Sequence, residues 1–212
     1  MPIFFQHQIN ETTRLGIWKI EETEEFFISN VPLQNEVTHP HKRLQHLAGR
    51  FLLQFLLPDF PYELIRIANT RKPFLPNEKY HFSISHCGDY AAAIVSSNQR
   101  VGIDIEIPTA KIERIKEKFL NEEEFKIFNI QYSMFNSQLP TPDSKLTTLL
   151  WSAKESVFKW YGHGKVDFRQ HIQLEQQHEG LQTINCYFAK TNQQLIIHYR
   201  PFEHLVLAWV MS

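Results

Sequence analysis

The sequence of 212 residues contains few cysteines, no long apolar run and almost no net charge. Its two cysteines, Cys87 and Cys186, stand far apart and form no CxxC pair. This pattern fits a reducing cytosol better than a scaffold built on disulfides or zinc. The 22 Lys and Arg residues balance 23 Asp and Glu residues, for a net charge of −1. Because no basic field results, we expect neither a nucleic acid nor a membrane as a partner.

The chain also lacks the signals of export and of membrane insertion. No stretch approaches the ~18 consecutive apolar residues that a spanning helix needs. The opening residues, MPIFFQHQIN, have no basic segment, and their apolar run is too short for a signal peptide. What the chain does have is 42% hydrophobic and 13% aromatic residues, enough for a substantial core. We therefore expect a cytoplasmic protein.

Apolar periodicity predicts an α+β fold in two halves. The segment HPHKRLQHLAGRFLLQFLLP at 39–58 places apolar side chains at i, i+3, i+4 and i+7 from Leu44 to Leu56, as an amphipathic helix does. Pro40 suits its first turn and Pro58 ends it. A second long helix is predicted over 146–161. Strands are predicted at 15–20, 25–29, 80–84, 90–96, 101–107, 172–176, 183–189, 194–200 and 204–210. Strands and helices do not alternate strictly, so we place two α+β domains at 1–105 and 106–212.

The predicted strand at 101–107, VGIDIEI, carries two carboxylates. Its β-branched residues alternate on one face, so Asp104 and Glu106 share the other face. Residues i and i+2 of a strand lie roughly 6.5–7 Å apart, and like charges this close repel unless a cation or water shields them. Two interpretations are open at this point: a solvated outer face, or a corner that holds a metal ion.

The two long helices carry charged side chains at helical spacing. On the second helix, Glu155 and Lys159 lie one turn apart, and such a pair is most often a surface ion pair worth about 0.3–0.5 kcal/mol. On the first helix, Lys42, Arg43 and Arg50 belong to a basic face. By itself, this face is most simply interpreted as solvated surface.

Four stretches in order along the chain connect these residues. They are RKPFLP at 71–76, FSISHCGDY at 82–90, VGIDIE at 101–106, and the helix residues Trp151, Ser152, Lys154, Glu155 and Lys159. In this order they closely resemble the motifs of the 4′-phosphopantetheinyl transferase superfamily, in its larger, surfactin-synthetase-activating type. The chain departs from the usual residues of that family at Arg71, Ser83 and Cys87, where glycine, asparagine and serine are common.

The resemblance implies a fold and a reaction. The fold would be two pseudo-equivalent α+β halves in one chain, each with a principal helix packed on a small antiparallel sheet, and the active site between them. The reaction would be the Mg²⁺-dependent transfer of phosphopantetheine from coenzyme A to a serine of an acyl or peptidyl carrier protein, with release of 3′,5′-ADP. Two halves in one chain make a monomer the simpler expectation.

The resemblance also implies roles for residues. Asp104, Glu106 and Glu155 are expected to hold Mg²⁺, and Glu155 and Lys159 to take part in catalysis. The expected coenzyme A contacts are Lys42, Arg43, Arg50, Lys72, Pro73, Ser85, His86 and Lys159. Glu124 could deprotonate the carrier serine through water or close a capping box with Asn121, and both roles stay open.

Two other function classes fit parts of the pattern. A metal-dependent nuclease or phosphohydrolase could use the same carboxylates and lysine, although the absence of a basic stripe argues against polymeric nucleic acid. A non-catalytic coenzyme A-binding module would be expected to have lost one of these residues. For the carrier protein we expect docking along the segment that follows Glu106. There Lys116 would steer the encounter, and Phe128, Met134 and Phe135 would form contacts unless the loop buries them.

Overall fold

The computed structural model describes residues 3–31, 37–128, 130 and 144–212. The chain divides into two compact units, Met1–Ile105 and Glu106–Ser212, called unit 1 and unit 2 below. The predicted α+β class is confirmed, since both units combine helices with antiparallel strands. Among the residues described, no helix is long and apolar enough to cross a membrane.

Unit 1 combines one long helix with two strands that precede it and a strand hairpin that follows it. In chain order its elements are β1 (Ile3–Gln8), β2 (Thr13–Lys19), α1 (Glu24–Ile28), α2 (Pro40–Leu56), η1 (Tyr62–Leu64), β3 (Arg66–Ile67), β4 (Pro73–Phe74), β5 (His81–Cys87) and β6 (Tyr90–Ser96). Strand β7 (Val101–Glu106) follows, and its last residue is the first of unit 2.

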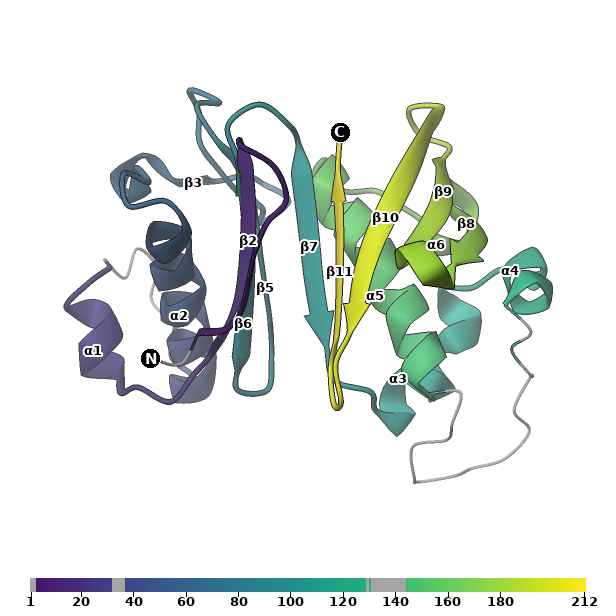
Figure 1. Ribbon diagram of the computed structural model, residues 1–212, viewed down its shortest axis with the longest axis horizontal. Coiled ribbons are helices and arrows are strands. Elements are labelled where there is room, and N and C mark those ends of the chain that lie inside the picture. Colours follow the sequence, from purple (N-terminus) through teal and green to yellow (C-terminus); the bar gives the residue numbers. More distant parts are fainter. Residues whose placement is uncertain (1–2, 32–36, 129, 131–143) are drawn as a thin grey trace. The chain divides into compact units, whose positions relative to one another are not determined.

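Unit 2 is built around a second long helix and a strand meander. After β7 come α3 (Ala110–Arg114), η2 (Lys116–Lys118), α4 (Glu122–Ile127), α5 (Ser144–Tyr161), α6 (Phe168–His171), β8 (Ile172–His178), η3 (Glu179–Leu181), β9 (Thr183–Phe188), β10 (Gln193–Pro201) and β11 (Val206–Met211). The five-stranded sheet has the order β7-β11-β10-β9-β8, with α5 packed against β11 and β10 (Figure 1).

In unit 1, helix α2 packs on a four-stranded antiparallel sheet of order β1-β2-β6-β5 (Figure 1). The predicted helix is confirmed, with Pro40 as its first residue. Its apolar face meets Trp18 and Phe82 of the sheet in one core. Gly49 allows the close approach, because a Cβ at this position would lie 2.6 Å from Cγ2 of Ile84 on β5. Helix and sheet therefore meet at van der Waals distance just where β5 carries the FSISHCGDY motif.

One predicted strand is wrong. Residues 24–28 form helix α1 and not a strand. Phe27 is buried on this helix, and its carbonyl accepts the N–H of Val31 at 2.9 Å just beyond the end of the helix. Glu24 and Glu25 occupy the first turn, where acidic side chains favour the helix dipole. The β-like composition of these residues is outweighed by packing against α2.

Candidate active site

Asp104 is buried on β7 and bonded to a neighbouring strand. It is 2% exposed, and its Oδ1 accepts a hydrogen bond of 2.8 Å from the hydroxyl of Ser85 on β5. Two residues earlier on β5, the hydroxyl of Ser83 accepts the backbone N–H of Ile103 at 3.2 Å. Side-chain bonds from the FSISHCGDY motif thus hold the VGIDIE strand. Of the two interpretations that the sequence left open, the solvated outer face is excluded for Asp104.

Glu106 is bonded to the second long helix. Its Oε1 accepts a hydrogen bond of 3.3 Å from the indole N–H of Trp151 on α5. The Trp151 ring is fixed in turn by edge contacts with Phe119, at 5.0 Å between ring centroids, and by a tilted contact with Phe168 at 5.6 Å. The motif tryptophan therefore connects α5 to the carboxyl end of β7.

On helix α5, the side chains that pack in the core lie on a different face from the predicted site residues. Leu150, Ala153 and Val157 are fully buried in the unit 2 core. Trp151, Glu155 and Lys159 are only partly buried and follow one another at i, i+4 and i+8, so they form one stripe along the helix. Because Trp151 contacts Glu106, the stripe starts at the end of β7, with Glu155 one turn further along.

No preformed metal cluster is found in the part of the chain that the structure describes: no three His, Cys, Asp or Glu side chains there form a group that could hold an ion. Ligation of Mg²⁺ by Asp104, Glu106 and Glu155 therefore stays a prediction. What the structure adds is the hydrogen-bonded position of the two strand carboxylates.

Lys154, the lysine of the motif that precedes Glu155, is wholly buried and forms a salt bridge with Glu124. Its Nζ lies 2.6 Å from Oε1 and 2.8 Å from Oε2 of Glu124. It also donates to the backbone carbonyls of Phe168 at 2.8 Å and Ile172 at 2.7 Å. Burial lowers the pKa of the Lys154 amine, and the charge of Glu124 opposes this effect. The sequence assigned Lys154 no role; its place beside Glu155 in the motif was the only signal.

Both carboxylate oxygens of Glu124 accept hydrogen bonds from groups within the protein. The capping box is confirmed: the Asn121 side chain accepts the N–H of Glu124 at 2.9 Å, and Glu124 Oε2 accepts the N–H of Asn121 at 2.8 Å. Oε1 accepts the N–H of Leu174 at 2.9 Å. The residue is 1% exposed. Action as a general base stays a prediction that this geometry does not favour, because both oxygens are bonded inside the protein.

The basic residues of α2 have different environments. Arg43 forms a two-pronged ion pair with Glu24 of α1, with Nε at 2.7 Å and Nη2 at 2.9 Å from the carboxylate oxygens. Arg50 is 6% exposed, and burial lowers its pKa. A solvated face is therefore excluded for Arg50, while Lys42 is exposed.

Two histidines lie beside these basic residues. The rings of His46 on α2 and His86 on β5 are 5.4 Å apart. Burial lowers the pKa of His46, and the charges of Arg50 and Lys42 lower it further. These four residues, Lys42, His46, Arg50 and His86, are called the basic cluster below. Among its members, His86 was predicted as a coenzyme A contact, whereas His46 was not.

Lys72 lies in a second positively charged environment. Burial, together with the charge of Arg100, lowers the pKa of Lys72 to about 8. The preceding residue, Arg71, has a φ of 66°, in the left-handed region that glycine adopts most easily. This explains why glycine is common at this position of the motif. Pro73 begins β4 and pairs with Ile67.

The predicted docking surface for a carrier protein needs correction. Lys116 is 3% exposed and forms an ion pair of 2.6 Å with Glu113, so it cannot steer a partner from the surface. Phe128 is buried in the unit 2 core. Met134 and Phe135 lie outside the described residues. The sequence could not show this, because basic and aromatic residues beside a loop occur in both buried and exposed settings.

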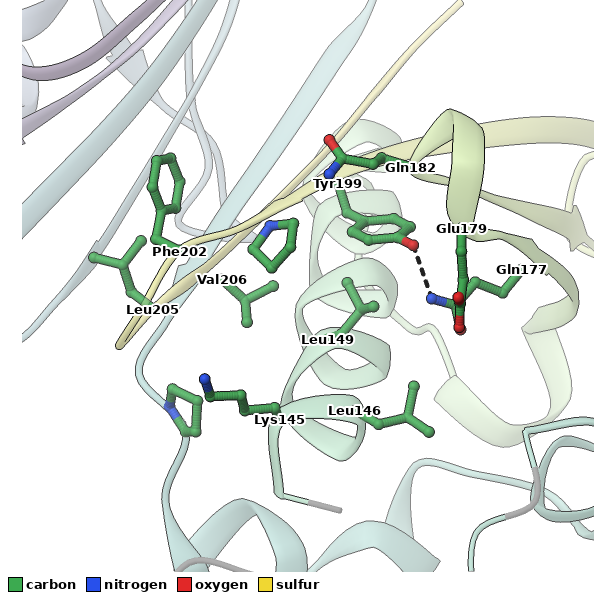
Figure 2. Close-up of a pocket in the computed structure, with 12 residues that line it drawn as sticks. Lys145, Leu146, Leu149, Gln177, Glu179, Gln182, Tyr199, Phe202, Leu205 and Val206 are labelled. Carbon is green, nitrogen blue, oxygen red and sulfur yellow. Dashed lines mark hydrogen bonds between the residues drawn. The ribbon is translucent and has the colours of Figure 1, made fainter. Parts of the chain in front are cut away.

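Unit 2 also contains a pocket of about 370 Å³ that involves none of the predicted site residues. Leu146 and Leu149 of α5 line one side, opposite Tyr199 and Val206 of the sheet (Figure 2). Gln177 and Tyr199 also line the pocket, and the side-chain amide of Gln177 donates a hydrogen bond of 2.8 Å to the Tyr199 hydroxyl (Figure 2).

Comparison with known proteins identifies the family. A family model described as "4′-phosphopantetheinyl transferase superfamily" matches residues 100–210, which is more than half of the chain. The match includes β7 with Asp104 and Glu106, and α5 with Glu155 and Lys159. The chain belongs to the 4′-phosphopantetheinyl transferase superfamily.

Curated relatives agree with this assignment. The chain is 35% identical over 123 residues to enterobactin synthase component D of Escherichia coli K12, covering 56% of this chain and 54% of that protein. It is 26% identical over 158 residues to the 4′-phosphopantetheinyl transferase AcpT of the same strain, covering 72% and 78%. It is 34% identical over 120 residues to the 4′-phosphopantetheinyl transferase gsp of Aneurinibacillus migulanus, covering 56% and 46%. The chain matches about half the length of the first of these relatives.

Proposed function

We propose that this protein transfers the 4′-phosphopantetheine group of coenzyme A to a serine of an acyl or peptidyl carrier protein, with release of 3′,5′-ADP, as an enzyme of the surfactin-synthetase-activating type. The observation that carries the proposal is the pair of motif carboxylates on β7. Asp104 is bonded to Ser85, and Glu106 is bonded to Trp151 on the helix that carries Glu155 and Lys159. The family membership and the names of the relatives support the same reaction.

The donor set fits Mg²⁺. This hard cation takes oxygen ligands, commonly one or two protein carboxylates, with waters and substrate phosphates completing the shell. Asp104 and Glu106 would supply two carboxylates and Glu155 a third. When bound, Mg²⁺ would neutralise the charge that develops on the pyrophosphate of coenzyme A.

The basic cluster would bind the phosphates at the nucleotide end of coenzyme A. Arg50 carries a guanidinium that burial has removed from most of its water, so an anion beside it gains a strong, charge-assisted hydrogen bond. Lys42 adds a second positive charge, and His86 offers a ring N–H from β5. Lys72, with Pro73, would serve the adenosine side. Arg43 is the weakest of the predicted contacts, because Glu24 already neutralises it.

Lys159 would act on the reacting phosphate. It lies one turn beyond Glu155 on the same stripe of α5, and an ammonium is a compact point charge that follows charge as it moves to the leaving oxygen. We further propose that the protein is a monomer and that it is cytoplasmic. Cys87 and Cys186 form no disulfide with each other, which is in keeping with a reducing compartment.

The decisive experiment is a transfer assay with purified components. The protein is incubated with coenzyme A, MgCl₂ and an apo carrier protein, and the intact mass of the carrier is measured. We expect the carrier to gain one phosphopantetheine group, and the Asp104→Ala variant to be slower by several orders of magnitude with an unchanged circular dichroism spectrum. Hydrolysis of coenzyme A without a carrier would instead indicate a phosphohydrolase. Binding of coenzyme A with no product on a panel of carriers would indicate a non-catalytic module.

A further inference from the structure

Each strand carboxylate of β7 receives a hydrogen bond from a side chain on a different element. The Ser85 hydroxyl donates to Asp104, and the Trp151 indole donates to Glu106. The two acceptors are the residues whose like charges should repel each other on one strand face. The two donors come from separate sequence motifs.

The hydroxyl of Ser85 donates to Asp104. A serine hydroxyl carries one hydrogen, and here that hydrogen is directed at Asp104 Oδ1 at 2.8 Å. Ser85 is 6% exposed, and its neighbour Ser83 bonds the backbone of β7 alongside. The predicted contact of Ser85 with a phosphate of coenzyme A stays a prediction.

The indole of Trp151 likewise donates to a carboxylate of β7. The indole N–H is its only polar hydrogen, and it is directed at Glu106 Oε1 at 3.3 Å. The ring cannot turn away easily, because it packs against the rings of Phe119 and Phe168. A fixed donor of this kind restricts the rotamers of a carboxylate that would otherwise be mobile at a strand end.

We propose that Ser85 and Trp151 are positioning residues that hold Asp104 and Glu106 in the orientation that binds the metal ion. Ser85 and Trp151 would restrict the two carboxylate side chains before the cation binds. Less conformational entropy is then lost when the metal ion binds. Partners of metal ligands commonly have this effect, and their loss weakens metal affinity by about 10–100-fold. The inference rests on the proposed function and assigns two residues to the metal end of its site.

The test measures metal binding directly. Mn²⁺, as a paramagnetic substitute for Mg²⁺, is titrated into the full-length protein, and free Mn²⁺ is quantified by electron paramagnetic resonance. Ser85→Ala and Trp151→Phe each remove one donor and keep most of the shape. We expect both variants to raise the Kd for Mn²⁺ by about tenfold or more, and Ser85→Thr, which keeps the hydroxyl, to restore most of the affinity.

Two matched controls separate positioning from loosening of the fold. Ser83→Ala removes a β5 hydroxyl that bonds backbone and not a carboxylate. Trp160→Phe makes the same exchange on the same helix, where the indole donates to Ser212 at 3.0 Å. Both controls should keep the wild-type Kd for Mn²⁺.

Two outcomes would overturn the inference. They are wild-type metal affinity in both Ser85→Ala and Trp151→Phe, or equal losses of metal affinity in the two controls. If Trp151→Phe does not fold, the Ser85 series decides alone. The transfer assay tests the proposed function separately. If the wild type modifies a carrier protein but the variants give one of these outcomes, the proposed function stands and only this inference fails.

Discussion

Lys154 Nζ lies 2.6 Å from Glu124 Oε1, and both side chains are buried. The pair joins α4 to α5, and it also reaches β8, because Glu124 bonds Leu174 and Lys154 bonds Ile172. Lys154 immediately precedes Glu155 on α5, so the same network fixes the helix that presents Glu155 and Lys159.

The first prediction is that breaking this pair strongly destabilises the protein. Removing one partner leaves a buried charge uncompensated, so Lys154→Ala and Glu124→Ala should each lower the free energy of unfolding by about 3–5 kcal/mol. The double variant Lys154→Met, Glu124→Leu should lose less than the sum of the two single losses. Urea denaturation followed by circular dichroism measures all three.

Lys126→Ala is the matched control, because Lys126 forms an exposed pair with Glu123 on the same helix. Its urea midpoint should stay close to wild type. A midpoint for Lys154→Ala that is equal to that of this control would show that the buried pair contributes little.

The second prediction concerns Lys159 and follows from the proposed function. If this ammonium stabilises charge that develops during transfer, Lys159→Ala should lower kcat much more than it raises KM for coenzyme A. Lys159→Arg should restore little, because a planar guanidinium does not replace a point charge. Steady-state kinetics with carrier in excess distinguish the two effects. A raised KM with wild-type kcat would make Lys159 a binding residue only.

The third prediction separates two arginines of α2. Arg50 is buried next to His46, whereas Arg43 is neutralised by Glu24. Arg50→Met should therefore weaken coenzyme A binding, and the preference for coenzyme A over its 3′-dephospho form should shrink. Arg43→Met should keep that preference and lower the thermal midpoint instead, since it releases α1 from α2. Calorimetric titration of both ligands into each variant measures this. Equal effects of the two substitutions on the preference would contradict the assignment.

The fourth prediction is a pH dependence of coenzyme A binding. The pKa of Lys72 is lowered to about 8, so its positive charge is present below that pH and is lost as the pH rises through it. Affinity for coenzyme A should therefore fall between pH 7 and pH 9.5. Stability should move the other way: above pH 8 the unfolded chain holds a proton on Lys72 that the folded chain has released, so folding is favoured as the pH rises.

Lys72→Arg provides the control for this dependence, because arginine keeps its charge over the whole range. Its affinity curve should be flatter than that of the wild type. Two superimposable curves would assign the pH effect to another group.

The sequence by itself determined the class and the motifs. The 3.6-residue period of α2 and the alternation of β7 are local properties, and both elements appear where the pattern predicts them. The order of the four motifs along the chain already resembled that of the superfamily to which the chain belongs. The capping box of Asn121 and Glu124 could also be predicted from the sequence, because both residues lie within one helical turn.

Only the tertiary structure decided which of those side chains have partners. Asp104 could have been solvated until Ser85, 19 residues away, was seen to bond it. Arg43 pairs with Glu24, which is 19 residues away in the sequence, and Glu124 pairs with Lys154, which is 30 residues away. Lys116 looked like a surface charge until packing buried it with Glu113. Periodicity shows which residues share a face, but it does not show what covers that face. Burial and pairing depend on contacts between distant segments, and in this protein these decide which charged groups are structural and which are available for chemistry.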